Sequence, residues 1–505
     1  MEWAPLLKGF TLIADPMNIG LIFVAVVIGV LVGALPGLSS SMAVALLLPL
    51  TIGMQPIPAI CMMAALYCAG TFGGSITAIL INAPGAPPAV ATAFDGYPLA
   101  QRGEAGRALG IAVFASVLGG IASLIIFIVA APALSAVATS FRHVEYFALA
   151  LFGLSMLATI SGRSSLRNLI AGAFGVLVGT IGMHEATGIK RFIPFDMYML
   201  EEGIGFVPVL IGLFAFGELL NQSGQLNRKL ELIKDVAIRL PSKADFLKVK
   251  GAIGRSSIIG TVIGILPAEG ATVAAIIGYN EAKRWSKNPE EFGKGSIEGI
   301  AGPEAANNAA TGGAMVPTLS LGIPGSGTTA IILVALMMHG FRPGPYLIRE
   351  TPEFVYAIFG AMLMANVMFF FLGMIGAKVF ARVTLIPRTF LWPVVLVFSV
   401  VGAYALNQSV FDVYVMLVAG VLGYIMLRHG FGPAPFVRGL ILAKLVEENF
   451  SNAMTYYDHE MTRFLESPIV VVFLILSLIT LFWIPLTNSL KKIRAATKDQ
   501  GTSVE

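Results

Sequence analysis

NAPGAPPAVATAF, which begins at Asn82, and GIPGSGTTAIILVAL, which begins at Gly322, are two versions of one short pattern. In each version a Pro-Gly pair stands between two apolar runs. Proline lacks a backbone N–H and glycine weakens a helix, so each pair is predicted to break a helix. A break at membrane depth is tolerated only where the chain is buried in protein or lines a cavity. Two broken helices at corresponding places in two halves of a chain indicate the binding site of a secondary transporter.

The composition is typical of a membrane protein. The chain has 505 residues, of which 56% are hydrophobic and 12% are charged, and its mean hydropathy is +0.82. Soluble domains average about a quarter charged residues. The predicted fold class is an all-α polytopic protein of the lipid bilayer, with about 11–12 transmembrane helices plus re-entrant hairpins and broken helices. The small net charge of +4 gives no indication of a nucleic-acid partner.

Two further breaks support an internal repeat. GALPGLSSSMAVALLLPLT starts at Gly33, and IGILPAEGATVAAIIGY starts at Ile263. In both, a Leu-Pro pair precedes an apolar segment, and in the first this segment is too short to span comfortably, which favours a half-helix or a re-entrant hairpin. The offsets between the halves are nearly constant: Pro36 to Pro267 is 231 residues, Gly73 to Gly312 is 239 and Pro84 to Pro324 is 240.

The predicted organisation follows from this repeat and from the charges. Residues 1–220 form the first repeat, 221–255 a basic linker that is partly an amphipathic helix, 256–488 the second repeat with the C-terminal spans, and 489–505 a tail. Lys and Arg residues place the linker and the tail in the cytoplasm. If the repeats are inverted, the N-terminus lies outside. The expected apolar spans lie near residues 18–34, 58–81, 111–135, 144–161, 166–183, 203–221, 354–381, 389–406, 410–428 and 468–486, with a polar loop or helix end over Asp95 to Gly110.

The breaks suggest an anion site. A half-helix that begins inside the membrane presents free N–H groups and a partial positive charge, which favour an anion. Ser39, Ser40, Ser41, Ser326, Thr328 and Thr329 add hydroxyl donors beside two such helix starts. Unwound carbonyls at the other helix ends can hold Na⁺. The pattern predicts a carboxylate substrate with coupled cations, although each break taken alone is equally explained as a kink that shapes the bundle.

A second polar cluster lies in GPEAANNAATGG, from Gly302 to Gly313. In a helix, Glu304, Asn307 and Asn308 share one face, which can line a cavity or bind a cation through amide oxygens. The alternative is an ordinary polar helix start with Pro303 at its first position. Glu269 presents a similar choice, because it either carries a proton or cation at membrane depth or caps the following helix.

Enzyme motifs are incomplete. GIPGSGTT resembles a phosphate-binding loop, but Thr328 replaces its lysine and no strand precedes it. His184-Glu185 lacks the second histidine of a zinc protease, and no serine has the pattern of an activated nucleophile. We therefore expect a protein that is not an enzyme, with no cofactor and no metal beyond Na⁺ as a coupling ion.

The blocks GALPGLSSSMAVALLLPLT, GGSITAILINAPG and PEAANNAATGGAMVPTLSLGIPGSGTTA resemble the large membrane subunit of the tripartite tricarboxylate transporter family. The resemblance covers nearly the whole chain. It implies a multi-pass permease subunit of the bacterial inner membrane that imports citrate-like di- or tricarboxylates with Na⁺ or H⁺. It also implies two partners, a small four-span membrane subunit and a periplasmic solute-binding protein. The wider superfamily implies an elevator-type motion of a transport domain against a scaffold. The alternative is a stand-alone organic-anion permease or channel without a binding protein.

The resemblance also assigns site residues. Carried onto this sequence, the blocks of the family fall on Pro36, Gly37, Ser39 to Ser41, Asn82, Pro84, Gly85, Pro267, Thr272, Glu304, Asn307, Asn308, Pro324, Gly325, Ser326, Thr328 and Thr329. The chain departs from the pattern in two places. Ala268-Glu269-Gly270 stands where the family usually has glycine after Leu-Pro, and Ala86-Pro87-Pro88 stands where a more polar residue is common.

Overall fold

The computed structural model describes residues 3–35, 37–138, 140–159, 165–184, 187–194, 197–222, 239–266, 270–383 and 388–481. In these ranges the chain is almost entirely helical, and its strands form one short hairpin. The prediction of an all-α polytopic membrane protein is confirmed. The chain divides into two compact units, Met1–Thr139 with Gly205–Arg428, and Ser140–Ile204 with His429–Glu505. Each unit therefore combines segments from both halves of the sequence.

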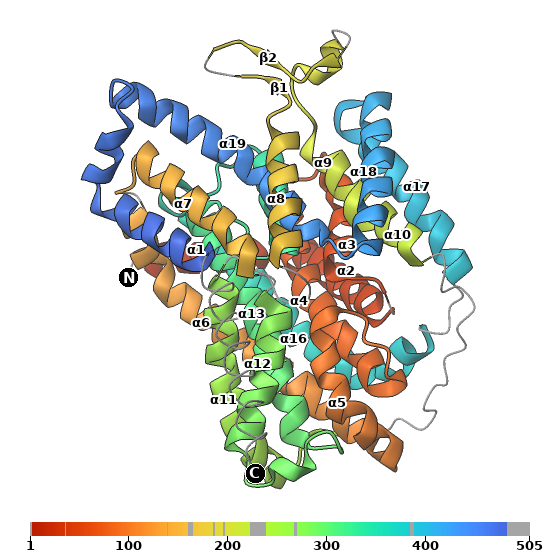
Figure 1. The fold of residues 1–505 in the computed structure, drawn as a ribbon. Coiled ribbons are helices and arrows are strands. Elements are labelled where there is room, and N and C mark those ends of the chain that lie inside the picture. The colour runs from red at the N-terminus through yellow and green to blue at the C-terminus, as the bar shows by residue number, and fades with distance from the viewer. Residues whose placement is uncertain are drawn as a thin grey trace, which may run out of the picture. The chain divides into compact units, whose positions relative to one another are not determined.

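The larger unit contains the helical breaks, and Figure 1 labels most of its helices. Its α-helices are α1 (Trp3–Ile13), α2 (Pro16–Ala34), α3 (Ser40–Leu47), α4 (Pro56–Ile81), α5 (Val90–Leu99), α6 (Ala105–Ala138), α9 (Phe206–Ile211), α10 (Gly217–Gln222), α11 (Lys243–Ile265), α12 (Gly270–Trp285), α13 (Ile297–Leu321), α14 (Gly327–Met338), α15 (Pro345–Glu350), α16 (Pro352–Val383), α17 (Arg388–Asn407) and α18 (Val410–Arg428). Short 3₁₀ or π turns join them: η1 (Leu48–Thr51), η2 (Pro87–Ala89), η3 (Ala100–Glu104), η7 (Gly212–Phe216) and η9 (Pro289–Glu291).

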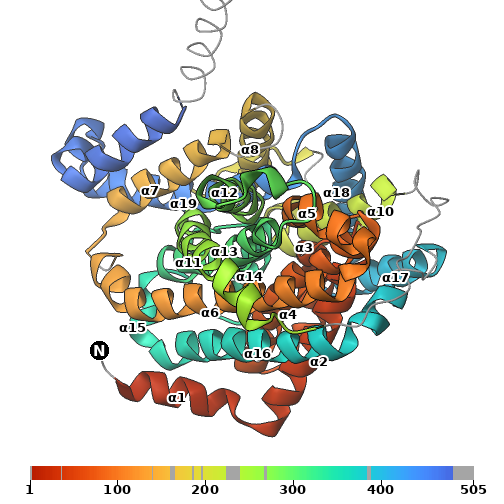
Figure 2. The same ribbon diagram turned by 90° about the horizontal axis from the view of Figure 1, so that it is seen from below.

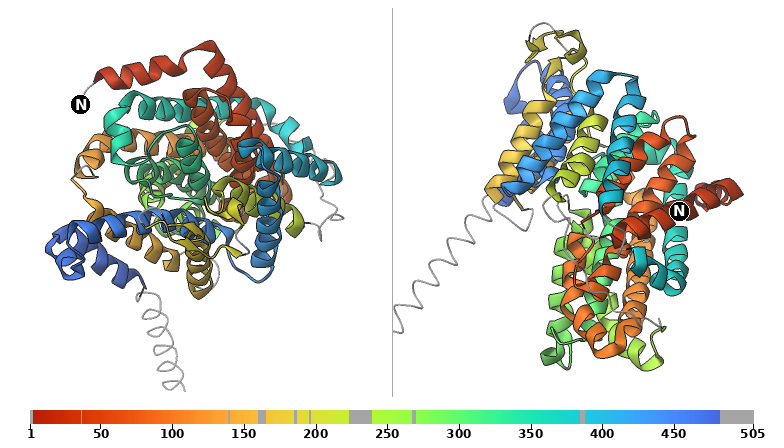
Figure 3. Two further views of the ribbon diagram at one scale, coloured as in Figure 1. Left: turned by 90° about the horizontal axis from the view of Figure 1, so that it is seen from above. Right: turned by 90° about the vertical axis from the view of Figure 1, so that its right-hand side faces the viewer.

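The smaller unit consists of α7 (His143–Ser155), η4 (Met156–Thr159), α8 (Ser165–Gly179), the hairpin β1 (Gly182–Met183) and β2 (Lys190–Arg191), η6 (Tyr198–Leu200), α19 (Pro433–Tyr456), η10 (Met461–Glu466) and an apolar helix over Pro468–Leu481. Strands β1 and β2 pair antiparallel, with Gly182 opposite Arg191. Helix α19 packs against both α7 and α8, and the right-hand view of Figure 3 shows α8 and α19 side by side.

Five helical segments of the described chain are long and apolar enough to cross a membrane: Pro16–Ala34, Pro56–Ile81, Pro87–Ala130, Pro352–Gly376 and Val410–Arg428. Several other expected spans are shorter apolar helices, such as His143–Ser155, Ser165–Gly179 and Phe206–Gln222. Helices of 10–17 residues are about 15–25 Å long, which is less than the thickness of the hydrocarbon core. The described chain thus contains both full-length spans and shorter apolar helices. Its many prolines and glycines favour the shorter ones, because both residues end or weaken helices.

Two buried helices form the centre of the larger unit. All of α4 from Ala59 onward and all of α13 up to Ser320 are buried. Helix α13 contacts α11, α6, α12 and α14, which surround it in Figure 2. Helix α4 packs against α2 and α16. These two helices carry the sequence blocks that precede the Pro-Gly breaks, so both breaks start from rigid, buried elements.

The packing of α2 on α4 matches the packing of α11 on α13. In both pairs two glycines of the first helix touch the backbone of the second so closely that an added Cβ would lie within 3 Å of a carbonyl oxygen: Gly29 at 2.9 Å from Leu66, Gly33 at 2.3 Å from Gly70, Gly260 at 2.2 Å from Ala306 and Gly264 at 2.6 Å from Ala310. The corresponding glycines are 231 residues apart, and their partners are 240 apart. The sequence offsets therefore recur in three-dimensional contacts.

Three local segments differ in detail from what the sequence alone indicates. Of the two alternatives for the segment from Asp95 to Gly110, a polar loop or a helix end, the structure has the helix end. Helix α5 ends at Leu99, the π turn η3 follows with a φ of +83° at Gly103, and α6 begins at Ala105. Helix α19 was not expected, because Arg438, Lys444 and Glu447 lower the hydropathy of its 24 residues. The C-terminal part of the basic linker, from Lys243 to Arg255, is helical and forms the N-terminal half of α11.

Candidate functional site

The two Pro-Gly breaks have the same backbone geometry. Helix α4 ends at Asn82 with a φ of +49°, and α13 ends at Gly322 with a φ of +71°, so both caps are left-handed. Each cap N–H donates to the carbonyl five residues earlier, on Thr77 and Pro317 respectively. A left-handed residue closes a helix because its N–H turns back to the last carbonyls. Two segments that differ in sequence thus make the same turn.

The glycine of each Pro-Gly pair lies against backbone. The N–H of Gly85 donates to the carbonyl of Gly74 at 3.4 Å, and a Cβ at Gly85 would be 1.9 Å from the carbonyl oxygen of Gly33. A Cβ at Gly325 would be 2.6 Å from the carbonyl oxygen of Ala314. Neither position has room for a side chain, so each break is fixed against its neighbouring helix.

Two helix N-termini from opposite halves meet in the larger unit. Ser39 caps α3 and Ser326 caps α14, each hydroxyl accepting a backbone N–H, at 3.2 and 3.1 Å. Between them, Ser41 Oγ and Thr328 Oγ1 are 2.7 Å apart, and the Tyr67 hydroxyl is 3.3 Å from Ser326 Oγ. Helix N-termini favour anions, and the hydroxyls beside them can donate to one. In the mirrored position, α12 contacts η2, which follows the first break.

Glu304 lies in a separate, fully buried cluster. Its Oε1 accepts hydrogen bonds from Ser75 Oγ at 2.5 Å and from Thr92 Oγ1, and its Oε2 accepts one from Ser116 Oγ at 2.6 Å. These hydroxyls belong to α4, α5 and α6, whereas Glu304 belongs to α13. Glu304 precedes the α13 cap by 18 residues, about 27 Å of helix, so it does not reach the break of its own half. Ser75 instead connects it to Gly74, which holds Gly85.

Two asparagines continue the same face of α13. Asn307 and Asn308 are each 1% exposed. In the described part of the chain both amide atoms of Asn307, and Oδ1 of Asn308, have no hydrogen-bond partner. Buried amides are normally satisfied, so unpaired ones point to a bound water, ion or ligand. The alternative of a polar helix start is wrong, because α13 begins at Ile297 and Pro303 lies inside it.

The remaining residues expected at the site lie at helix ends and in first turns, or fall outside the described residues. Gly37 has a φ of +89°, and its carbonyl accepts a hydrogen bond from Gln222 of α10. Ser40 packs on Gly70 of α4, and Thr272 is half-buried in the first turn of α12. Pro84 and Pro324 follow their helix caps by two residues. Three expected residues lie outside the described residues: Pro36, Pro267 and Glu269.

Four residues of these clusters were not expected from sequence: Tyr67, Ser75, Thr92 and Ser116. Each is a single polar residue within an apolar run, and such residues often bond their own helix instead. The sequence offers one signal, for Ser75 alone, because this residue directly follows the Gly-Gly pair that recurs in both halves.

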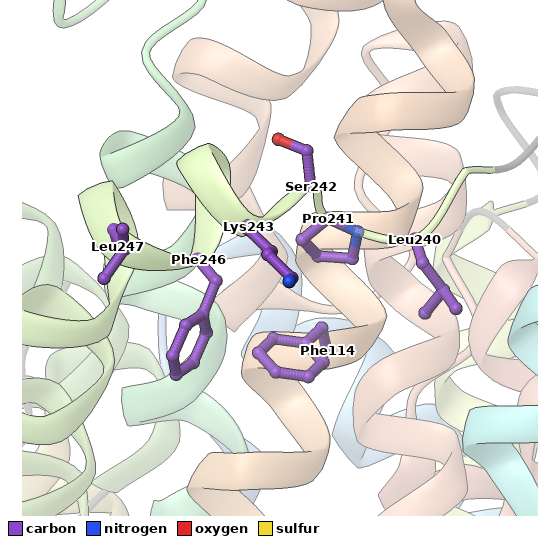
Figure 4. Close-up of a pocket in the computed structure, with 7 residues that line it drawn as sticks. All are labelled: Phe114, Leu240, Pro241, Ser242, Lys243, Phe246 and Leu247. Carbon is purple, nitrogen blue, oxygen red and sulfur yellow. The ribbon is translucent and has the colours of Figure 1, made fainter.

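A groove at the start of α11 is not part of these clusters. It has a volume of about 490 Å³ and lies between α6 and the chain that enters α11 (Figure 4). The lining residues are Phe114, Leu240, Pro241, Ser242, Lys243, Phe246 and Leu247. None of them is a candidate site residue.

Comparisons with known proteins show the family of this chain. The Tripartite tricarboxylate transporter TctA family model matches residues 19–438. An "Uncharacterized 52.8 kDa protein in TAR-I ttuC' 3'region" of Agrobacterium vitis is 37% identical over 471 residues, which is 93% of each chain. A second protein of that organism, from the TAR-II ttuC' 3'region, is 38% identical over 44% of this chain and 91% of its own. No solved structure matches. The matched range contains every break and both buried clusters, and the chain therefore belongs to the tripartite tricarboxylate transporter TctA family.

Proposed function

We propose that this chain is the large permease subunit of a binding-protein-dependent secondary transporter in the bacterial inner membrane. It imports a citrate-like di- or tricarboxylate together with Na⁺ or H⁺. A small four-span membrane subunit and a periplasmic solute-binding protein complete the system. The family, as a transporter family, argues against an enzyme.

The observation that carries this proposal is the meeting of α3 and α14 through Ser41 and Thr328, 2.7 Å apart. Two helix N-termini with hydroxyls directed at each other suit a ligand with several carboxylates, because each terminus can hold one group. The unpaired amide oxygens of Asn307 and Asn308 suit a cation. The matched glycine contacts support an internal structural repeat, and the division into two compact units supports an elevator-type motion.

Uptake by proteoliposomes tests the proposal. Vesicles containing this chain and its small partner, with the binding protein outside, receive labelled citrate or another acid from a carboxylate panel under a Na⁺ gradient or a pH gradient. We expect uptake that requires both the binding protein and one gradient. Uptake without the binding protein favours a stand-alone permease, and flux without any gradient favours a channel. The absence of uptake for every acid, with folded and assembled protein, contradicts the proposal.

Cysteine accessibility tests the topology. If the repeats are inverted and the basic linker is cytoplasmic, the N-terminus is outside. A Glu2→Cys variant in a background without Cys61 and Cys68 should react with an impermeant maleimide added to intact spheroplasts. Labelling that requires lysis of the membrane contradicts inverted repeats in this orientation. Lys250→Cys, in the linker, is the matched control and should label only after lysis.

A further inference from the structure

Glu304 is a fully buried carboxylate of the larger unit whose two oxygens accept hydrogen bonds from three hydroxyl groups. Asp95 binds three backbone N–H groups, Asp245 binds Arg107 at 2.5 Å, and Glu304 binds Ser75, Thr92 and Ser116. Within the described residues no Lys, Arg or His forms an ion pair with Glu304. A carboxylate that is removed from water without a cation is costly unless its charge is compensated. The carboxyl group of Glu304 can therefore change its charge, because no salt bridge fixes it in the ionised form.

In the described part of the chain, no other titratable group on the helices around α13 is hydrogen-bonded to Glu304. Helices α4, α5, α6, α11, α12, α14 and α15 contact it. The Tyr67 hydroxyl contacts Ser326, and Asp95 binds the loop before α13. Arg107 pairs with Asp245, Glu281 pairs with Arg284, and Arg255 lies over the Trp285 ring. Cys61 and Cys68 are buried thiols, and the end of α14 and α15 carry His339, Tyr346, Arg349 and Glu350. The three hydroxyls are thus the hydrogen-bonding environment of Glu304.

Hydroxyl partners suit either charge state. A Ser or Thr hydroxyl can donate to a carboxylate and can also accept from a carboxylic acid, because its hydrogen rotates. When Glu304 gains a proton, its new O–H donates to one of the three hydroxyls, which turns its own hydrogen elsewhere. An arginine partner would instead stabilise only the ionised form. The geometry keeps hydrogen bonds to both carboxyl oxygens in either state.

The repeat shows that packing alone does not require this cluster. At the 240-residue offset, Glu304 corresponds to Ala64, Ser75 to Met315 and Thr92 to Ile332. Ala64, Met315 and Ile332 are all fully buried. The other half therefore fills three of the four positions with apolar side chains, and the fourth, Ser116, corresponds to Tyr356. A buried carboxylate with its own set of hydroxyls in one half only indicates a role in function.

We propose that Glu304 takes up and releases the proton that moves with the substrate, an inference that rests on the proposed function. The carboxylate binds one proton from one side of the membrane and returns it to the other, with no change in oxidation state. Ser75 connects this event to the first break, because the adjacent Gly74 accepts the N–H of Gly85. Protonation of Glu304 thus acts on helix α4, whose Gly74 carbonyl holds the break at Gly85.

Infrared difference spectroscopy on the purified subunit tests the site without requiring transport. A pH titration should show a carboxylic-acid carbonyl band that is present in the wild type and in Glu298→Gln but missing in Glu304→Gln. Glu298 is the matched control, because it is a buried glutamate of the same helix that binds Ser286 at 2.5 Å. Ser116→Ala keeps the carboxyl group and should shift the midpoint of that band. A set of bands unchanged in Glu304→Gln overturns the proposal.

Transport supplies the second test. Proteoliposomes with a trapped pH dye, clamped membrane potential and the binding protein outside report proton entry with substrate. Glu304→Gln should exchange substrate across the membrane but move no protons, whereas Glu298→Gln should behave as the wild type. Proton entry in Glu304→Gln overturns the inference, as does wild-type uptake that follows Na⁺ and moves no protons, although the proposed function then stands. A wild type that transports no acid refutes the proposed function, and the infrared titration still decides the state of Glu304.

Discussion

Gly85→Leu and Gly325→Leu are expected to abolish carboxylate uptake while the chain still inserts into the membrane. A Cβ at Gly85 would lie 1.9 Å from the carbonyl oxygen of Gly33, and one at Gly325 would lie 2.6 Å from that of Ala314. Both neighbours are backbone atoms of packed helices, so they cannot swing aside as a flexible side chain does. Excess volume in a packed site costs about 1–3 kcal/mol and displaces the backbone. The displaced segment is the break on which the proposed substrate site depends.

Gly20→Leu is the matched control, because Gly20 also lies in an apolar helix but a Cβ there meets nothing within 4 Å. Uptake in proteoliposomes is measured together with the amount of monodisperse protein extracted from the membrane. Normal insertion and extraction with lost uptake is the expected result for both site variants. Gly85→Ala adds only the clashing atom and should already reduce uptake. If both leucine variants transport at the rate of Gly20→Leu, the breaks are kinks and the site lies elsewhere.

The breaks could be predicted because their cause is local. Proline and glycine act on the residues next to them, and the same pair at two places in a repeat marks both helix ends. The left-handed caps at Asn82 and Gly322 follow this pattern even though only one of them is glycine. Asn82 can take the cap because asparagine tolerates a positive φ better than most residues.

The partners of the polar residues could not be predicted, since they come from helices far apart in sequence. Glu304 is 229 residues from Ser75 and 188 from Ser116. Their contact depends on the angle at which buried helices cross, and hydropathy carries no information about that angle. The same limit explains Asp95. From the sequence its polar segment is either a loop or a helix end, whereas in the structure Asp95 lies within α5 and is buried by its hydrogen bonds to the loop before α13.

Asp95→Ala is expected to be the most destabilising single change in the larger unit outside the breaks. Its Oδ1 accepts the backbone N–H groups of Gly293, Gly295 and Ser296, each at 2.8 Å, and its Oδ2 accepts the Tyr279 hydroxyl at 2.9 Å. The side chain is fully buried, and the Ser296 N–H is buried with it. A buried donor left without a partner costs about 1–3 kcal/mol, so the free energy of unfolding should fall by about 2–4 kcal/mol.

Three variants separate this role from a general effect of charge. Asp95→Asn keeps one oxygen for the loop N–H groups and should lose less stability than Asp95→Ala. Tyr279→Phe removes one hydrogen bond and should lose least, about 1 kcal/mol. Glu290→Ala is the control, since it removes an exposed carboxylate from the same loop. Thermal unfolding of the detergent-solubilised protein, followed by size-exclusion chromatography, ranks them. Equal stability of Asp95→Ala and Glu290→Ala would show that the loop before α13 does not depend on this carboxylate. The predicted ranking instead means that Asp95 fixes the start of the helix that carries Glu304, Asn307 and Asn308.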